Sequence, residues 1–312
     1  MDMKHKPSGI ERGLEFVAEH TFQLKERMWM ENLAENLPVI RNGRDIREIP
    51  KCNGSAIVVG AGASIKRYGQ LETIEGSGFG GTVIATDKML KPCITAGIAP
   101  DLVMTADGDS VIATFYEGVG KLTEEVFRSP DQVSKKTKAI LNALTVHPET
   151  VAKVPYEIFW YMSPVDDPLA KKSLTRAIHF MTKKTILSSL GNVGGQAFNL
   201  AYFLGADPVI LVGLDCGYPP ETPLEETSYY NTYAELAKRQ GKKVEEYFTT
   251  VQNPDTGKEV MLDMNWGVYR KIALDHFQRA KCKIVNCSPI SSLFGQNIEF
   301  VDLDEALKRW PS

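Results

Sequence analysis

Acidic and amide side chains follow several apolar runs of this sequence, at the points where the runs end. If those runs are parallel β-strands, their carboxyl ends meet at one edge of a sheet, where doubly wound proteins bind their ligands. Carboxylates gathered there can hold Mg²⁺, bind ribose hydroxyls or act as a general base. The side chains placed in this way are Asp87, Asp107, Asn142 and Asp215.

The first apolar run, residues 56–59, is followed by a turn that contains Gly60, Gly62 and Ser64. The two glycines let the backbone turn sharply and leave N–H groups exposed at the start of the next segment, which favours a phosphate. Ile65 stands where a dinucleotide-binding fingerprint has its third glycine, and the Gly-Lys-Ser/Thr of a P-loop is absent. The turn predicts a nucleotide or another phosphorylated ligand, and a tight turn without a ligand is the plain alternative.

A second glycine-rich segment covers residues 188–206. Ser188, Ser189 and Asn192 stand where a helix over residues 194–204 would begin, and the N-terminus of a helix favours an anionic group. Close packing of the helix on the sheet explains the glycines equally well. Two separate anion-binding turns suit a diphosphate, or a nucleotide monophosphate joined to an acidic sugar.

The acidic residues have two readings. Asp107 and Asp109 are two positions apart, so in an extended segment both could face one side, as a bridging cation such as Mg²⁺ requires. Asp87 and Asp109 equally fit as caps of the helices that follow them. Asp107 and Asp215 come directly after their strands, and we predict these two as the catalytic residues.

Strand signals alternate with helix signals from residue 55 on, which predicts an α/β, Rossmann-like fold with a mostly parallel sheet and helices on both faces. Residues 1–50 form a predicted N-terminal helical arm, with a break at Pro38, and residues 51–312 form the main domain. Within it, residues 218–265 read as a lid-like or acceptor-binding insertion. The predicted strands cover residues 56–59, 82–86, 102–105, 138–141, 156–161, 209–212 and 283–285.

Composition is that of an ordinary globular protein, with 43% hydrophobic residues and a formal net charge of −3. The lysines and arginines are dispersed, which argues against a nucleic-acid partner. No long apolar run predicts a membrane span or a secretory leader, so we expect a cytoplasmic protein. The five cysteines and five histidines lack metal-ligand spacing, which disfavours a zinc site. The sequence leaves open whether the chain forms a homo-oligomer.

Several blocks in the same order give the chain a family resemblance over roughly residues 32–307. It resembles the family that joins Maf-type flagellin glycosyltransferases to the archaeal 6-hydroxymethylpterin diphosphokinases, called MptE-like. The Gly191-Asn192-Val193 block is closer to the Maf branch. The blocks that carry the resemblance lie at residues 57–64, 96–101, 107, 191–193 and 204–215.

The resemblance implies a nucleotide-dependent transferase. In the first reading, a CMP-activated nonulosonic sugar is the donor, held by Gly60, Gly62, Ala63 and Ser64 and by residues 191–193, with no obligatory metal and a small-molecule or protein acceptor. In the second, an ATP-dependent 6-hydroxymethyl-7,8-dihydropterin diphosphokinase holds Mg²⁺ at Asp107 and Asp109. A third hypothesis is a non-catalytic nucleotide-sugar-binding module. Asp87, Asn142 and Ser189 are further predicted contacts of the nucleotide or substrate, whichever of the three hypotheses holds.

Two departures from the family pattern bear on the mechanism. Ala63 stands where the family usually has proline, which keeps the neighbouring glycines intact. Maf-like proteins tend to carry a histidine shortly after the block that ends in Asp215, and residues 216–230 contain none. His276 lies in a predicted helix, where a lone histidine is more often structural. The sequence therefore leaves the general base unassigned.

Overall fold

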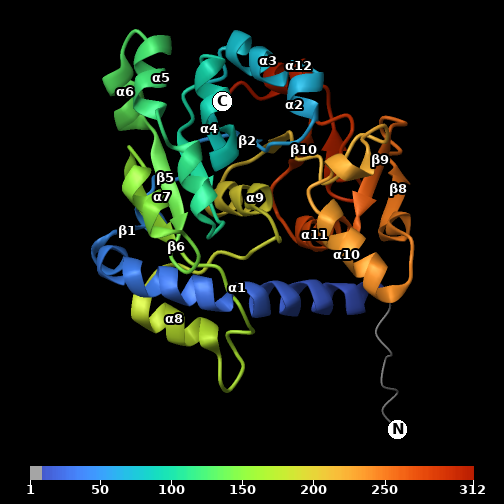
Figure 1. Ribbon diagram of the computed structural model, residues 1–312. Coiled ribbons are helices and arrows are strands. Elements are labelled where there is room, and N and C mark those ends of the chain that lie inside the picture. The colour runs from blue at the N-terminus through green and yellow to red at the C-terminus, as the bar shows by residue number, and fades with distance from the viewer. Residues whose placement is uncertain (1–8) are drawn as a thin grey trace.

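A nine-stranded parallel sheet organises the protein, seen here in a computed structural model that describes residues 9–312, with side chains from residue 24 onward (Figure 1). The first eight positions of the predicted arm lie outside the described residues. The strands of the sheet are β1 (Arg44–Asp45), β2 (Ala56–Val59), β3 (Thr82–Thr86), β4 (Leu102–Thr105), β5 (Lys138–Asn142), β6 (Glu157–Tyr161), β7 (Val209–Val212), β10 (Ile284–Asn286) and β11 (Ile298–Phe300).

Helices connect the strands, and they cover both faces of the sheet. The α-helices are α1 (Gly9–Asn42), α2 (Ser64–Arg67), α3 (Gln70–Ser77), α4 (Leu90–Thr95), α5 (Val119–Val126), α6 (Pro130–Lys136), α7 (Pro148–Lys153), α8 (Leu174–Thr182), α9 (Val193–Phe203), α10 (Tyr230–Gln240), α11 (Met264–Phe277) and α12 (Leu303–Arg309). Short 3₁₀ helices are η1 (Ile46–Glu48), η2 (Asp87–Met89), η3 (Ser110–Phe115), η4 (Leu224–Glu226) and η5 (Val244–Tyr247).

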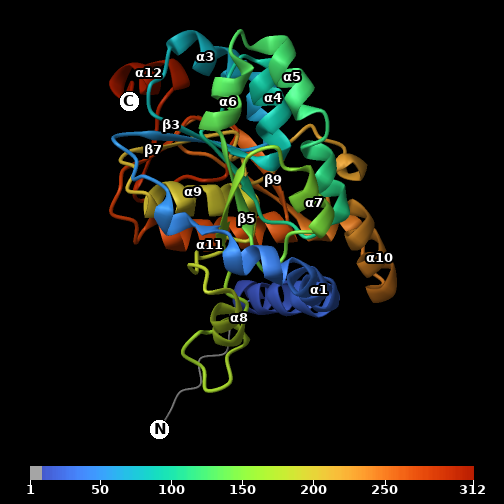
Figure 2. The same ribbon diagram turned by 90° about the vertical axis from the view of Figure 1, so that its left-hand side faces the viewer.

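Side chains of each strand alternate between two apolar layers, as the two-residue period of a strand requires. In β2, Ala56 and Val58 pack against α9 and α11, whereas Ile57 and Val59 pack against α3 and α12 on the other face. All four side chains are fully buried, which explains why the run is continuously apolar. Figure 2 shows the sheet between these two groups of helices. The predicted α/β, Rossmann-like fold is confirmed.

The strand order places a switch point in the middle of the sheet. The order is β1-β6-β5-β4-β3-β2-β7-β10-β11, and every neighbouring pair is parallel. From β2 the chain adds strands in one direction as far as β6, and then β7 returns to the other side of β2. From β2 the chain continues to β3 on one side, and from β7 it continues to β10 on the other, so the switch point lies between β2 and β7, where such sheets bind ligands.

Residues 218–265, predicted as an insertion, contain a small sheet outside the main one, and we call this segment the subdomain; its lid-like or acceptor-binding role stays a prediction. It holds α10 and an antiparallel hairpin of β8 (Phe248–Gln252) and β9 (Glu259–Asp263), which is separate from the main sheet. The hairpin leads directly into α11. In Figure 1 the subdomain lies at one side of the domain, beside α11.

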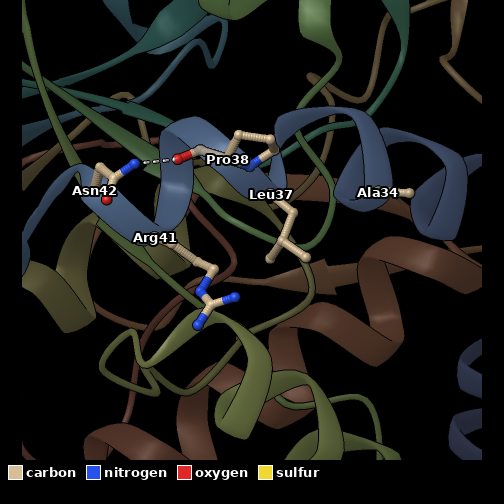
Figure 3. A pocket seen from close by; sticks show the side chains of 5 residues that line it. All are labelled: Ala34, Leu37, Pro38, Arg41 and Asn42. Atoms are coloured by element: carbon tan, nitrogen blue, oxygen red, sulfur yellow. Dashed lines mark hydrogen bonds between the residues drawn. The ribbon is translucent and has the colours of Figure 1, made fainter.

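The N-terminal helix α1 continues past Pro38, where the sequence predicted a break, and ends at Asn42. Proline removes one backbone hydrogen bond from a helix interior. Burial of Leu33 and Ile40 on either side of Pro38 favours the continuous helix, and the Asn42 side-chain amide donates to the Pro38 carbonyl at 3.0 Å. Figure 3 shows this part of α1, where a hollow is lined by Ala34, Leu37, Pro38, Arg41 and Asn42.

Both views show α1 between the main domain and α8, and it contacts α7, α8 and α11 (Figures 1 and 2). Among the described residues, no helix combines the length and the apolar character that crossing a membrane would require.

Candidate active site

A cleft of about 870 Å³ opens at the carboxyl ends of the central strands. Its walls come from the loops after β2 to β7, from the N-terminus of α9, from α11 and from α1. Ser64 and Asp109 do not line it. The predicted site residues that do are Gly60, Gly62, Ala63, Asp87, Asp107, Asn142, Ser189, Gly191, Asn192, Val193 and Asp215. The structure thus gathers most of the predicted residues around one cavity, and their roles stay predictions.

The glycine turn after β2 differs from the sequence expectation, because its N–H groups are bonded within the protein. Gly60 N–H donates to the Val212 carbonyl and Gly62 N–H donates to the Gly213 carbonyl, each at 2.8 Å. These bonds join the two loops of the switch point. A Cβ at either glycine would lie 2.6 Å from the Gly213 carbonyl oxygen, so glycine is needed for this close approach. The N–H groups of Gly60 and Gly62 are therefore engaged within the protein and do not point to a ligand.

Asp215 occupies the anion position that the turn creates. Its carboxylate, 2% exposed, accepts hydrogen bonds from the backbone N–H and the hydroxyl of Ser64. It also interacts with the backbone of Ala63 and the side chain of Ser288. Burial raises the pKa of Asp215 to about 6, and the hydrogen bonds oppose that rise. The carboxylate therefore fixes the turn from inside.

Replacing Gly62 by alanine tests this internal bonding. The added Cβ would lie 2.5 Å from Oδ2 of Asp215 and 2.6 Å from the Gly213 carbonyl oxygen. We expect the strain to lower the free energy of unfolding by roughly 1–3 kcal/mol, measured by urea denaturation. Gly76→Ala is the matched control, because nothing lies within 4 Å of its added Cβ in α3, and alanine favours the helix. Equal stability of the two variants would contradict the tight turn.

The N-terminus of α9 provides hydrogen-bond donors that are still open. Asn192 caps the helix by accepting from the Gly195 N–H at 2.9 Å, while its own Nδ2 is among the buried donors without an acceptor in the described part of the chain. The first N–H groups of a helix have no acceptor within it, and Val193 and Gly194 line the cleft. The helix dipole adds positive potential. This end of the cleft suits an anionic group.

Gly191 lies one residue before the cap and has a left-handed φ of +87°. A Cβ here would also collide with the ring of Tyr269, which packs on the glycine backbone from α11. This position therefore requires glycine for two independent reasons.

Four aromatic residues, Tyr218, Tyr229, Trp266 and Tyr269, form what we call the aromatic wall of the cleft. Ring centroids of Trp266 lie 6.4 Å from Tyr218 and 5.7 Å from Tyr269, both edge to face. The Tyr218 hydroxyl donates to the buried carboxylate of Asp263 at 2.9 Å, which fixes the wall from behind. Burial raises the pKa of Asp263. The predicted insertion thus contributes the first half of the wall.

Asp87 is a buried carboxylate at the end of β3, 4% exposed, and it lines the cleft. It accepts a hydrogen bond from the Lys88 N–H at 2.7 Å. Burial raises its pKa to about 7, and the negative charge of Asp107 adds to the rise, whereas hydrogen bonds from Lys88 and Thr105 oppose it. A carboxylate with such a pKa can accept a proton near neutral pH.

Asp107 and Asp109 have different surroundings. Asp107 faces the cleft and forms an ion pair of 3.2 Å with Lys25 of α1. Asp109 caps η3, since its carboxylate accepts the Val111 N–H at 3.0 Å. The two side chains do not both face the cleft, and a shared Mg²⁺ ion at this pair stays a prediction.

Asn142 belongs to a buried polar network that the sequence did not reveal. Its amide donates to the Ser163 hydroxyl at 3.0 Å, and the amide of Gln196 donates to the hydroxyls of Ser163 and Ser189 at 3.2 Å each. Gln196 also accepts from the hydroxyl of Tyr161. The network joins the ends of β5 and β6 to α9 and so fixes that side of the cleft.

Lys25 and Trp29 of α1 also line the cleft, and the sequence analysis did not include them. The available signal was their spacing: Lys25, Trp29, Asn32 and Asn36 recur on one helical face. The amide of Asn32 donates to the Gly108 carbonyl at 3.0 Å. The helical arm therefore docks on the site itself.

Comparisons with known proteins bear on the family and the fold of the chain. The profile of the family described as 6-hydroxymethylpterin diphosphokinase MptE-like matches residues 30–221, more than half of the chain. The chain belongs to this family. The predicted family resemblance is confirmed, and membership supports a transferase at the level of reaction class. A comparison with curated proteins finds no match.

Among solved structures, the MAf glycosyltransferase from Magnetospirillum magneticum AMB-1 is similar in fold, with a TM-score of 0.57 and 18% sequence identity. The similarity covers 90% of this MptE-like chain but only 38% of that protein, so this chain spans well under half of its relative's length. At this identity the likeness shows the fold alone.

Proposed function

We propose that the chain is a nucleotide-dependent glycosyltransferase of the Maf type, which uses a CMP-activated nonulosonic sugar as its donor. One observation carries the proposal. The open donors at the N-terminus of α9 and the buried carboxylate of Asp87 line the same cleft, at the switch point of the sheet. A phosphate site beside a neutral-pH base is what transfer from an activated phosphate to a hydroxyl requires.

The donor phosphate binds at the start of α9 in this proposal. The N–H groups of Val193 and Gly194, together with Nδ2 of Asn192, hold its oxygens. The turn over Gly60, Gly62 and Ala63 forms the floor on which the nucleotide lies, and Asp215 keeps that floor in place. Asn142 and Ser189 support the same side of the cleft.

Asp87 takes the role of general base, which the missing histidine leaves vacant. Its carboxylate accepts the proton of the acceptor hydroxyl as the acceptor oxygen bonds to the anomeric carbon of the sugar. The bond from that carbon to the phosphate oxygen breaks, and cytidine monophosphate leaves with the electron pair. The α9 N–H groups stabilise the developing charge. Asp107 binds hydroxyl groups of the reacting sugars.

The aromatic wall forms the acceptor end of the cleft. Tyrosine and tryptophan combine an apolar ring with a polar handle, which suits a ring-bearing acceptor or a protein side chain. The subdomain over residues 218–265 carries part of the wall. Asp107 and Tyr269 line the same cleft, so an acceptor bound at the wall shares its cavity with Asp107.

A diphosphokinase is the second candidate, because the family description names that activity and because Asp87 and Asp107 both line the cleft. In that reaction these two carboxylates would hold Mg²⁺, which neutralises charge on the transferring diphosphate. A binding module without turnover is the third candidate.

A thermal-shift panel tests the proposal. Cytidine monophosphate, cytidine triphosphate, ATP and GTP are each added with and without Mg²⁺, and the melting temperature is recorded. We expect cytidine nucleotides to raise Tm without Mg²⁺, because a ligand that binds only the folded state stabilises it. A shift by ATP that depends on Mg²⁺ would favour the diphosphokinase. No shift with any nucleotide would reject all three candidates.

A further inference from the structure

The cleft needs positive charge that the glycine turn does not provide. Its lining contains three carboxylates, Asp87, Asp107 and Asp215, while the described lysines that line it are Lys25 and Lys88. We propose that Lys25 of α1 binds the phosphate of the donor nucleotide, which makes the N-terminal helix part of the active site. The inference rests on the proposed function and assigns one of its residues.

The position of Lys25 is fixed by the way α1 docks. Nδ2 of Asn32 donates to the carbonyls of Gly108 and Thr145 at 3.0 and 2.8 Å, and Nδ2 of Asn36 donates to the Val146 carbonyl at 2.9 Å. Both asparagines are buried. Lys25 lies on the same helical face, two turns before Asn32. Buried amides therefore hold α1 against the loops that follow β4 and β5.

Trp29 secures the turn of the helix nearest to Lys25. A Cβ added at Gly108 would meet the indole ring at 3.0 Å, so the ring packs directly on the backbone next to Asp107. Lys25 follows one turn away and reaches Oδ1 of Asp107 at 3.2 Å. The helix thus places the Lys25 ammonium group beside the loop that follows the carboxyl end of β4.

Lys25 lines the same cleft as the N-terminus of α9. Helix α1 also contacts α11, whose Tyr269 ring packs on Gly191, next to the α9 cap. An anion bound at the start of α9 therefore shares its cavity with the Lys25 ammonium group.

The Lys25–Asp107 ion pair leaves the ammonium group free to bind a phosphate as well. The two side chains are 38% and 51% exposed, and exposed pairs of this kind contribute little to stability. An ammonium group has three donors, so it can keep Asp107 and donate to a phosphate oxygen at once. Asp107 then orients the lysine toward the ligand.

Binding of cytidine monophosphate and of cytidine, measured by calorimetry, tests the assignment. We expect Lys25→Met to weaken binding of the monophosphate about tenfold, as loss of one charge-assisted hydrogen bond predicts. Binding of cytidine should be unchanged. Lys25→Arg keeps the charge and should retain most of the affinity. Arg27→Met is the matched control on the same helix, because Arg27 is 91% exposed and pairs with Glu31.

If Lys25→Met weakens binding of cytidine and of its monophosphate equally, the role of Lys25 is structural and the assignment is overturned. Unchanged binding of the monophosphate by Lys25→Met would overturn it as well. If the wild type binds no cytidine nucleotide, the proposed function fails, and pyrophosphate becomes the probe of Lys25. Pyrophosphate binding that Lys25→Met weakens would then support the lysine alone. A wild type that binds neither compound overturns both.

Discussion

Replacing Asp107 by asparagine is expected to lower kcat/KM for transfer by roughly 100-fold or more, with the fold intact. The carboxylate lies in the cleft and about half of it is exposed, and asparagine keeps an oxygen that can accept the Gly108 N–H, so the fold should tolerate the change. Its loss removes the hydroxyl-binding anion and the partner that orients Lys25. The measurement is steady-state transfer with the nucleotide donor identified by thermal shift, beside a circular-dichroism melt that reports folding.

Asp109→Asn is the matched control, two residues along the chain. Asp109 caps η3 and lies outside the cleft lining, so the glycosyltransferase proposal predicts loss of about 1 kcal/mol of stability at most, with transfer retained. If both variants lose turnover and added Mg²⁺ restores part of it, Asp107 and Asp109 share the metal, and the diphosphokinase is favoured with this pair of ligands in place of Asp87 and Asp107. Unaltered transfer by Asp107→Asn removes that residue from the site.

The sheet could be predicted from the sequence because its central strands are buried on both faces. Runs such as residues 56–59 and 209–212 are continuously apolar, and the structure has strands with the same bounds. Strands β1, β8, β9 and β11 were not predicted. Strand β1 is two residues long, and β8 and β11 are partly exposed, so none of these three carries a clear apolar pattern. Strand β9 is mostly buried, but it pairs only with the exposed β8 in a hairpin outside the main sheet.

Convergence of the polar residues could also be predicted, because parallel strands end at one edge. The hydrogen-bond partners of these loops could not be predicted. Whether the amides of Gly60 and Gly62 face a ligand or a neighbouring loop depends on β7 lying beside β2, a contact more than 140 residues apart in sequence. The same holds for Asp215, whose carboxylate meets Ser64 only after the sheet has formed.

Docking of α1 was hidden for a related reason. A helical face of Lys25, Trp29, Asn32 and Asn36 reads as ordinary solvent-exposed sequence, since asparagine and lysine are usually exposed. This face becomes an interface only because its asparagine amides donate to the carbonyls of Gly108, Thr145 and Val146, which the folded chain brings to the cleft. Asparagines that recur on one face of a helical arm are therefore a signal to examine near a predicted site.

Asp87→Asn is expected to lower kcat about 10²- to 10⁴-fold, because asparagine cannot accept the proton of the acceptor hydroxyl. In the wild type the deprotonated carboxylate is the active form. Its pKa of about 7 predicts that kcat/KM rises tenfold per pH unit below 7 and levels off above it. A wild-type profile that stays flat from pH 5 to pH 9 would contradict the assignment of the base.

Asp87→Asn should be more stable than the wild type at high pH, although it is less active. Burial raises the pKa of Asp87 from its ordinary value of 3.8 to about 7, so the protonated side chain is favoured in the folded protein. Its contribution to stability is complete below pH 3.8 and is lost as the pH rises through 7. Asparagine stays neutral at every pH and avoids that loss. We therefore expect the Tm of Asp87→Asn to exceed that of the wild type at pH 9 by more than at pH 5, as for a residue retained for catalysis at a cost in stability. Thermal unfolding across this range measures the difference, and a gap that narrows with rising pH would contradict a buried, titrating carboxylate.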